Sequence, residues 1–233
     1  MFPHEINNSA HTVRIQDLMY RVYGWMCVGL SLTASVAYNI AKTPALMTAI
    51  YSNWWIVLLL VFSQFALIIA LSVFLVRLSF ATAAFLFVLY SLLVGATLSS
   101  IFLVFTLGSI FTTFFVAAGM FGAMSLYGYF TGADLSKLRS FLFMALFGLI
   151  IALIVNMFIQ SSRFDTILSF FGVGIFILLI AYDTQKIKQI AQRLIADHQS
   201  IDKVALFGAL TLYLDFLNLF LFLLQISGQR RSD

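Results

Sequence analysis

The chain has 233 residues, of which 62% are hydrophobic and only 9% are charged, and its mean hydropathy is +1.04. A soluble domain is usually about one quarter charged, so the composition excludes a soluble domain and indicates a protein whose solvent is lipid. The net charge of +4 arises without a basic cluster, which excludes nucleic acid as a credible partner. Cys27 is the only cysteine, which excludes an intramolecular disulfide and a cysteine-based metal site.

Seven apolar runs follow one another, each close to the 20 residues or so that a helix needs to cross the hydrocarbon of a bilayer. The third and fourth are separated by very little and are predicted to form a tight hairpin, whereas a polar stretch at 186–203 separates the last two. We therefore predict an all-α polytopic membrane protein with seven transmembrane helices, preceded by a polar lead at 1–19 and followed by a short tail at 227–233. The runs cover 20–41, 54–76, 80–103, 108–130, 140–160, 164–185 and 204–226.

The distribution of basic residues predicts the orientation. With seven spans, nine of the 13 Lys and Arg residues fall on the side of the N-terminus, and four fall on the other side. The N-terminus is then cytoplasmic and the C-terminus lies outside. Arg230 and Arg231 in the tail oppose this arrangement, so a six-span form with a re-entrant last segment stays open.

Two acids, Asp183 and Asp215, stand inside the last two apolar runs. A carboxylate within a membrane span is costly and persists where it pairs, titrates or touches water. Asp183 precedes Lys186 by three residues and can form a local pair with it. The run boundaries place Asp183 about 5–10 Å nearer the cytoplasm than Asp215, at 1.5 Å per residue. If the two carboxyls nevertheless meet, we expect them to titrate as one unit near neutral pH, sharing a proton or binding a cation.

Other polar groups surround this pair in the sequence. Thr211 and Asn218 share a helical face with Asp215, and such a polar stripe either bonds to neighbouring helices or lines a water-filled cavity. Arg77, between the second and third runs, is either an anchor at the membrane surface or a counter-ion of the two acids.

Three stretches of the sequence resemble the Bax inhibitor family, also called the transmembrane Bax inhibitor motif family, and in particular its bacterial branch. They are YGYFTGADLSKLRSFLFMALFGLIIALIVNMF (127–158), AYDTQKIK (181–188) and ALTLYLDFLNLFLFLL (209–224). Gly132 and Arg139 depart from the family's pattern, in a loop predicted to be cytoplasmic. The resemblance implies two-helix layers around a central seventh helix. It also implies that Asp183 and Asp215 form a pH sensor and gate, which Arg77 can latch.

The function implied by this resemblance is a pH-sensitive calcium leak channel of the bacterial inner membrane, without enzymatic activity or cofactor. Ca²⁺ prefers six to eight oxygen ligands, so Asp183 and Asp215, helped by Asn218, would form only a weak metal site for the passing ion. One alternative is a non-transporting modulator of a membrane-anchored quality-control protease or a stress response, acting through the N-terminus or the 186–203 segment. A remote alternative is an intramembrane aspartyl protease, which would need GxGD where this chain has LYLD.

Overall fold

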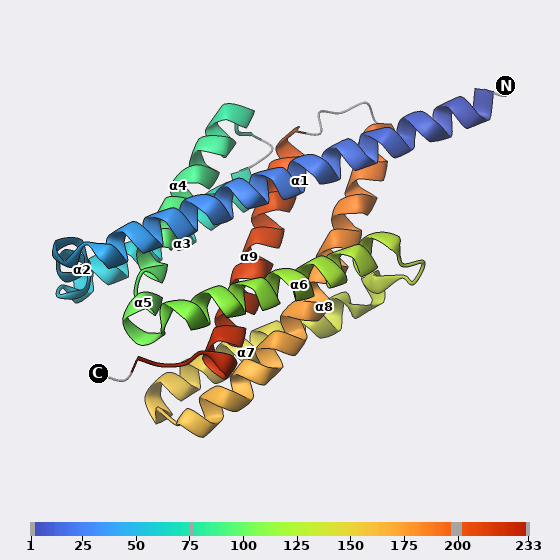
Figure 1. Ribbon diagram of the computed structural model, residues 1–233. Helices are drawn as coiled ribbons and strands as arrows, with labels where there is room; N and C mark the ends of the chain where they lie inside the picture. The colour runs from blue at the N-terminus through green and yellow to red at the C-terminus, as the bar shows by residue number, and fades with distance from the viewer. Residues whose placement is uncertain (1–2, 75–76, 197–201, 232–233) are drawn as a thin grey trace. The chain divides into compact units, whose positions relative to one another are not determined.

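The computed structural model describes residues 3–74, 77–196 and 202–231, with side chains for 14–74, 77–193 and 202–231. These residues form helices joined by short turns, with one isolated antiparallel bridge between Phe105 and Arg230. The predicted all-α class is therefore confirmed. The helices are α1 (Pro3–Lys42), α2 (Pro44–Tyr51), α3 (Trp54–Phe74), α4 (Phe80–Leu98), α5 (Ile101–Val104), α6 (Leu107–Phe130), the short 3-10 helix η1 (Leu135–Leu138), α7 (Arg139–Ile159), α8 (Ser162–Ala196) and α9 (Asp202–Ser227) (Figure 1).

Six stretches among the described residues are long and apolar enough to cross a membrane. They correspond to the second through seventh predicted runs. The first run, 20–41, lies within α1 and is not among them, so the count of seven is not confirmed. Its apolar residues are interrupted by Arg21, Asn39 and several small polar side chains. The six stretches are Trp54–Phe74, Phe80–Val104, Leu107–Phe130, Leu135–Ile159, Ser162–Arg193 and Asp202–Ser227.

Two polar segments that the sequence analysis separated from the spans are helical in the structure. Helix α1 runs without a break from Pro3 through the predicted lead, and α8 continues to Ala196, well into the segment 186–203. The prediction of a loop directly after residue 185 is therefore wrong. Lys186, Lys188 and Arg193 end the apolar run, but no Gly or Pro ends the helix there, and Ile187 and Ala191 stay buried at helical spacing.

The chain divides into two compact units, the first of which comprises Met1–Val104 and Ile190–Tyr213. In this unit α1 packs along α4 so closely that a Cβ on Gly95 would lie 2.7 Å from the carbonyl oxygen of Thr33. The hydroxyl of Thr33 also lies 2.6 Å from that of Tyr213, which is fully buried. The first half of α9 is therefore held in the first unit by a hydrogen-bonded tyrosine.

The second unit comprises Phe105–Gln189 and Leu214–Asp233, and it contains both membrane acids. A tight turn joins α7 to α8, with Gln160 in the left-handed region at a φ of 53° (Figure 1). Asn156 holds this turn, because its side chain accepts a hydrogen bond from the Ser161 N–H and donates one to Asp165. Farther along α8, the Ser169 hydroxyl donates to the Gln225 side chain of α9 at 2.7 Å. This bond joins α8 to α9 at a residue that precedes Asp183 on α8 and one that follows Asp215 on α9.

Candidate functional site: the acid pair of α8 and α9

Asp183 lies in a stretch of α8 that is buried on every side. Each residue from Leu179 to Gln185 is buried, and Asp183 itself is 7% exposed. A helix that merely bordered lipid or water would show an exposed face every three or four residues. The packing is also tight two residues earlier, where a Cβ on Gly128 of α6 would overlap the backbone of Ala181. The helix backbones therefore approach closely beside Asp183.

Asp215 lies near the middle of α9 and is 6% exposed. Its Oδ2 atom is buried and has no hydrogen-bond partner among the described residues. The Asp215 carboxyl interacts electrostatically with Asp183 and with Lys186, which have opposite charges. The two acids are therefore within electrostatic range of each other, and the offset along the membrane normal that their positions in the runs predicted stays a prediction.

Lys186 completes the site, because its ammonium lies 3.7 Å from the Asp183 carboxylate. This is the local pair that the sequence offered as the simpler interpretation of Asp183. The pairing leaves Asp215 as the acid with an unsatisfied oxygen. A buried polar atom without a partner costs free energy, which marks the position as one retained for a reason other than stability.

Hydrogen bonds around Asp183 fix its helix to neighbouring segments. Thr184, the next residue, is fully buried and its hydroxyl lies 3.0 Å from that of Ser125 on α6. The Gln185 side chain donates to the Ala133 carbonyl at 2.8 Å and accepts from the Leu135 N–H at 2.9 Å. The loop between α6 and η1 is thereby bonded to the turn of α8 that carries the acid.

The same loop contains an acid that does not belong to the pair. Asp134 is exposed and caps η1, accepting a hydrogen bond from the Ser136 N–H at 3.0 Å. Hydrogen bonds from the side chain and backbone of Ser136 hold the pKa of Asp134 below its usual range. Asp134 therefore stays ionised throughout the neutral range.

The remaining predicted site residues lie in different places. Arg77 is exposed in the turn between α3 and α4 and belongs to the first unit, so its role as a latch stays a prediction. The Thr211 hydroxyl donates to the Phe207 carbonyl, and the Asn218 amide donates to the Leu214 carbonyl at 2.8 Å. Both bonds stay within α9, so a contribution of Thr211 or Asn218 to the acid pair also stays a prediction.

The sequence analysis did not identify Gln185, Lys188 or the Ser125–Thr184 bond as part of the site. Lys188 donates from its ammonium to the Tyr129 carbonyl at 2.7 Å, so a second α8 side chain holds the end of α6. Gln185 and Lys188 stand within the motif AYDTQKIK, directly after Asp183. Their position directly after a membrane acid was the sequence feature from which their place in the site could have been predicted.

A helical protein with several segments apolar enough to cross a membrane and a buried acid in each of its last two helices belongs to the polytopic membrane proteins. The family model described as "Inhibitor of apoptosis-promoting Bax1" matches residues 15–232. The chain therefore belongs to the Bax inhibitor family, as the resemblance predicted.

Bacterial relatives match over nearly the whole chain. The chain is 49% identical over 218 residues to the inner membrane protein YbhL of Escherichia coli K12, covering 93% of each protein. It is 45% identical to an uncharacterised protein of Borreliella burgdorferi, covering 91% of this chain and 92% of the relative. It is 35% identical to an uncharacterised membrane protein of Streptococcus pyogenes serotype M1. Together with the apolar helices, this similarity supports a multi-pass protein of the inner membrane.

Proposed function

We propose that this protein is a calcium leak channel of the inner membrane, opened by rising pH through Asp183 and Asp215. The observation that carries the proposal is the buried Oδ2 of Asp215, which lacks a partner in the described structure while its carboxyl is within electrostatic range of another acid. Two facing acids are a poor choice for holding helices together and a suitable one for binding a proton or a cation.

The proposed topology keeps the N-terminus in the cytoplasm. Residues 20–41 of α1 then cross the membrane as the first of seven spans, and α9 is the central seventh helix with its C-terminal end outside. The excess of basic residues on the cytoplasmic side supports this orientation.

Gating follows from the charge of the pair. At low pH the two carboxyls share a proton, which binds α8 to α9 and closes the path. As the pH rises the proton leaves, and repulsion between two carboxylates in a medium of low dielectric constant favours their separation. Arg77 then stabilises the separated state as a latch.

Calcium is the transported ion in this mechanism and needs only a transient site. The described residues contain no cluster of three or more acidic, His or Cys side chains that could hold a metal. Asp183 and Asp215, with Asn218, backbone carbonyls and waters, supply fewer protein ligands than a tight calcium site requires. Weak binding suits a leak, because an ion must leave the site as easily as it enters.

The test is calcium flux into proteoliposomes as a function of pH, for the wild type and for Asp183→Asn and Asp215→Asn. Each single substitution removes one member of the pair, so the pH dependence should be lost in both variants. Wild-type pH dependence in both would exclude the acid pair as the sensor. Absence of flux at every pH in the wild type would leave the non-transporting modulator as the better candidate.

Removing residues 2–13 separates the leak from the modulator. This deletion retains the ion pairs of Arg21 with Asp17 at 3.0 Å and with Asp202 at 2.6 Å, which join α1 to the start of α9. A leak should survive the deletion, whereas docking of a protease partner through the N-terminus should not.

A further inference from the structure

The second unit contains an open groove between the start of α6 and the end of α9. The groove has a volume of about 410 Å³, and we call it the hydroxyl groove after the hydroxyl side chains in its otherwise largely apolar lining. Ser227 in this lining lies twelve residues after Asp215 on α9, which corresponds to about 18 Å along the helix. The hydroxyls that line it belong to Thr106, Ser109, Thr112, Thr113 and Ser227.

Hydrogen bonds to the end of the chain give the groove a defined shape. The Thr106 N–H donates to the Gln229 carbonyl at 2.9 Å, and the Gln229 N–H donates to the Ser109 hydroxyl at 2.9 Å. At its inner end the Thr113 hydroxyl, which is 97% buried, lies 3.4 Å from that of Ser227. The groove is therefore a defined hollow where α9 ends, with hydroxyl groups within a largely apolar lining.

The electrostatics of the groove favour passage of ions over retention. The positive end of the α6 dipole and the negative end of the α9 dipole meet there and offset each other. Hydroxyl oxygens are ligands that a hydrated calcium ion accepts.

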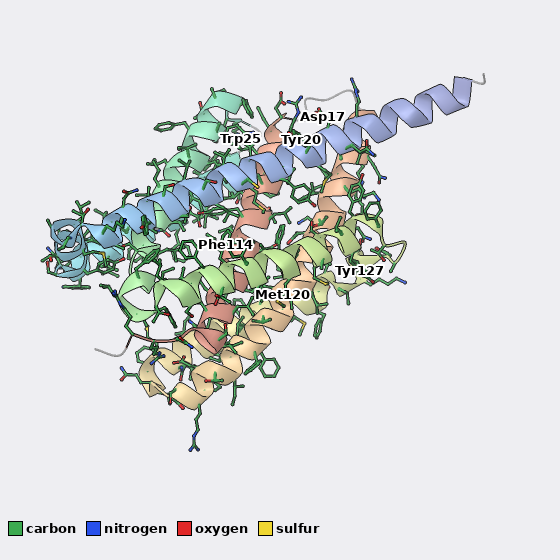
Figure 2. All side chains as sticks on the ribbon, in the orientation of Figure 1. Asp17, Tyr20, Trp25, Phe114, Met120 and Tyr127 are labelled. Atoms are coloured by element: carbon green, nitrogen blue, oxygen red, sulfur yellow. The ribbon has the colours of Figure 1, made fainter. Side chains whose placement is uncertain are left out.

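A layer of phenylalanine rings lies deeper between the same two helices. Phe114 of α6, labelled in Figure 2, packs edge-on against Phe216 and Phe220 of α9. The ring centroids are 5.4 Å and 6.3 Å apart. Phe121, two turns along α6, packs edge-on against Phe216 at 5.7 Å. Phe216 and Phe220 are both almost fully buried. This layer contains no polar atom that could replace the hydration shell of an ion.

Beyond the phenylalanine layer, both helices reach the acid pair. On α6 the next polar group is the buried Ser125, bonded to the neighbour of Asp183, and on α9 Phe216 directly follows Asp215. Thr113 and Ser125 are about 18 Å apart along α6. Along α6 the order is hydroxyl groups, phenylalanine rings and then the serine bonded beside the acid site, and on α9 Phe220 and Phe216 lie between Ser227 and Asp215, with Gln225 and Asn218 among them.

We propose that the α6–α9 contact is the ion path of the second unit and that Phe114, Phe216 and Phe220 are its hydrophobic gate. The proposal rests on the leak function proposed above. A narrow apolar constriction excludes water, so it blocks a hydrated ion without any charge. The gate is then a second barrier, separate from the acid pair, between that pair and the hydroxyl groove.

The first test replaces the gate residues with serine and measures calcium flux in proteoliposomes across the pH range. Phe216→Ser and Phe220→Ser should raise the flux several-fold at every pH while keeping its pH midpoint. Phe222→Ser is the matched control, because Phe222 lies on the same helix, is similarly buried and stacks on Phe176 of α8 at 5.9 Å. Equal flux in all three variants would overturn the gate.

The second test does not depend on a large core substitution. In a Cys27→Ser background, Ser109→Cys and Ser125→Cys are treated with a cationic thiol reagent added on the side of the C-terminus. Ser109→Cys should react rapidly and its modification should reduce the flux, whereas Ser125→Cys should react rapidly only when Phe114→Ser is also present. Phe114 is only half-buried, so its replacement should spare the fold. Rapid reaction of Ser125→Cys behind an intact gate would overturn the proposal.

The two proposals fail in different ways. A wild type without calcium flux overturns the leak, while the order of thiol reactivity still decides whether the phenylalanine layer excludes water. A wild type with pH-dependent flux that the serine variants leave unchanged overturns the gate alone.

Discussion

The ammonium of Lys186 lies 3.7 Å from the carboxylate of Asp183, one turn along α8, and its charge also reaches Asp215. In this conformation the acid pair therefore has a counter-ion on α8, the helix that carries Asp183. A latch by Arg77 would compete with a cation that is already present.

Replacing Lys186 with methionine should move the pH midpoint of the flux upward. Without the neighbouring positive charge, the pair retains its shared proton to a higher pH. A partly exposed ion pair contributes about 0.2–1 kcal/mol, which corresponds to a shift of less than about one pH unit. The measurement is the flux–pH curve in proteoliposomes.

Two other charge-removing variants serve as controls for Lys186→Met. Lys188→Met removes a charge two residues away, whose ammonium is bonded to the Tyr129 carbonyl. Asp134→Asn removes an acid whose lowered pKa keeps it ionised until the pH falls below the usual range for Asp, so it cannot titrate near neutrality. Neither variant should move the midpoint, and a shift as large as that of Lys186→Met would count against a specific role for Lys186.

Replacing Asp215 with leucine should stabilise the protein while abolishing its pH response. The substitution removes a buried oxygen without a partner in the described structure, and such an atom costs about 1–3 kcal/mol. The thermal unfolding midpoint in detergent should therefore rise. Asp183→Asn is the comparison, since it mainly loses a weak ion pair and should change the midpoint little. A lower midpoint for Asp215→Leu would show that its carboxyl holds the fold together.

Replacing Gly128 with alanine should loosen α6 from α8. The added Cβ would overlap the backbone of Ala181, whose carbonyl carbon and Cα lie 2.9 Å from its position. Overpacking of this kind costs about 1–3 kcal/mol, which a lower unfolding midpoint would reveal. Gly122→Ala on the same helix meets nothing within 4 Å and serves as the control. Equal stability of both variants would contradict the close contact.

Replacing Gln185 with methionine should release the loop between α6 and η1. The Ala133 carbonyl and the Leu135 N–H would lose their side-chain partner, and the exposed Lys137 beside them is a trypsin site. Limited proteolysis in detergent should therefore become faster. Ser136→Ala leaves both Gln185 bonds in place and should be cut at the wild-type rate. Equal rates of cleavage in the two variants would show that the Gln185 hydrogen bonds do not hold this loop.

Composition and run length were sufficient to predict the helical class and most span boundaries, because a bilayer allows only helices of a certain length. The ends of α1 and α8 could not be predicted in this way. Hydropathy detects where side chains leave the lipid, whereas a helix ends only where its backbone bonding ends. For the same reason the short α2, which begins at Pro44, was missed although its proline favours a helix start.

The two acids were predictable as costly residues, but their electrostatic interaction was implied only by the family resemblance and not by helix spacing. The end of an apolar run does not mark the end of its helix, since α8 continues to Ala196, so run boundaries are a poor reference for the relative heights of the two acids. The contacts of Gln185 and the phenylalanine layer depend on which helix faces which. A single sequence does not carry that information.

The pairing of Phe105 with Arg230 fixes the last described residues next to the start of α6. This position matters for the choice of an affinity or fluorescent tag. A protein domain fused after residue 233 would be tethered within a few residues of the hydroxyl groove. A bulky fluorescent or affinity tag there would block the hydroxyl groove, and its removal by a site-specific protease would restore the access of ions to the groove. An N-terminal tag avoids this interference. A cleavable C-terminal tag would show, by the change in flux on its removal, whether ions pass through the groove.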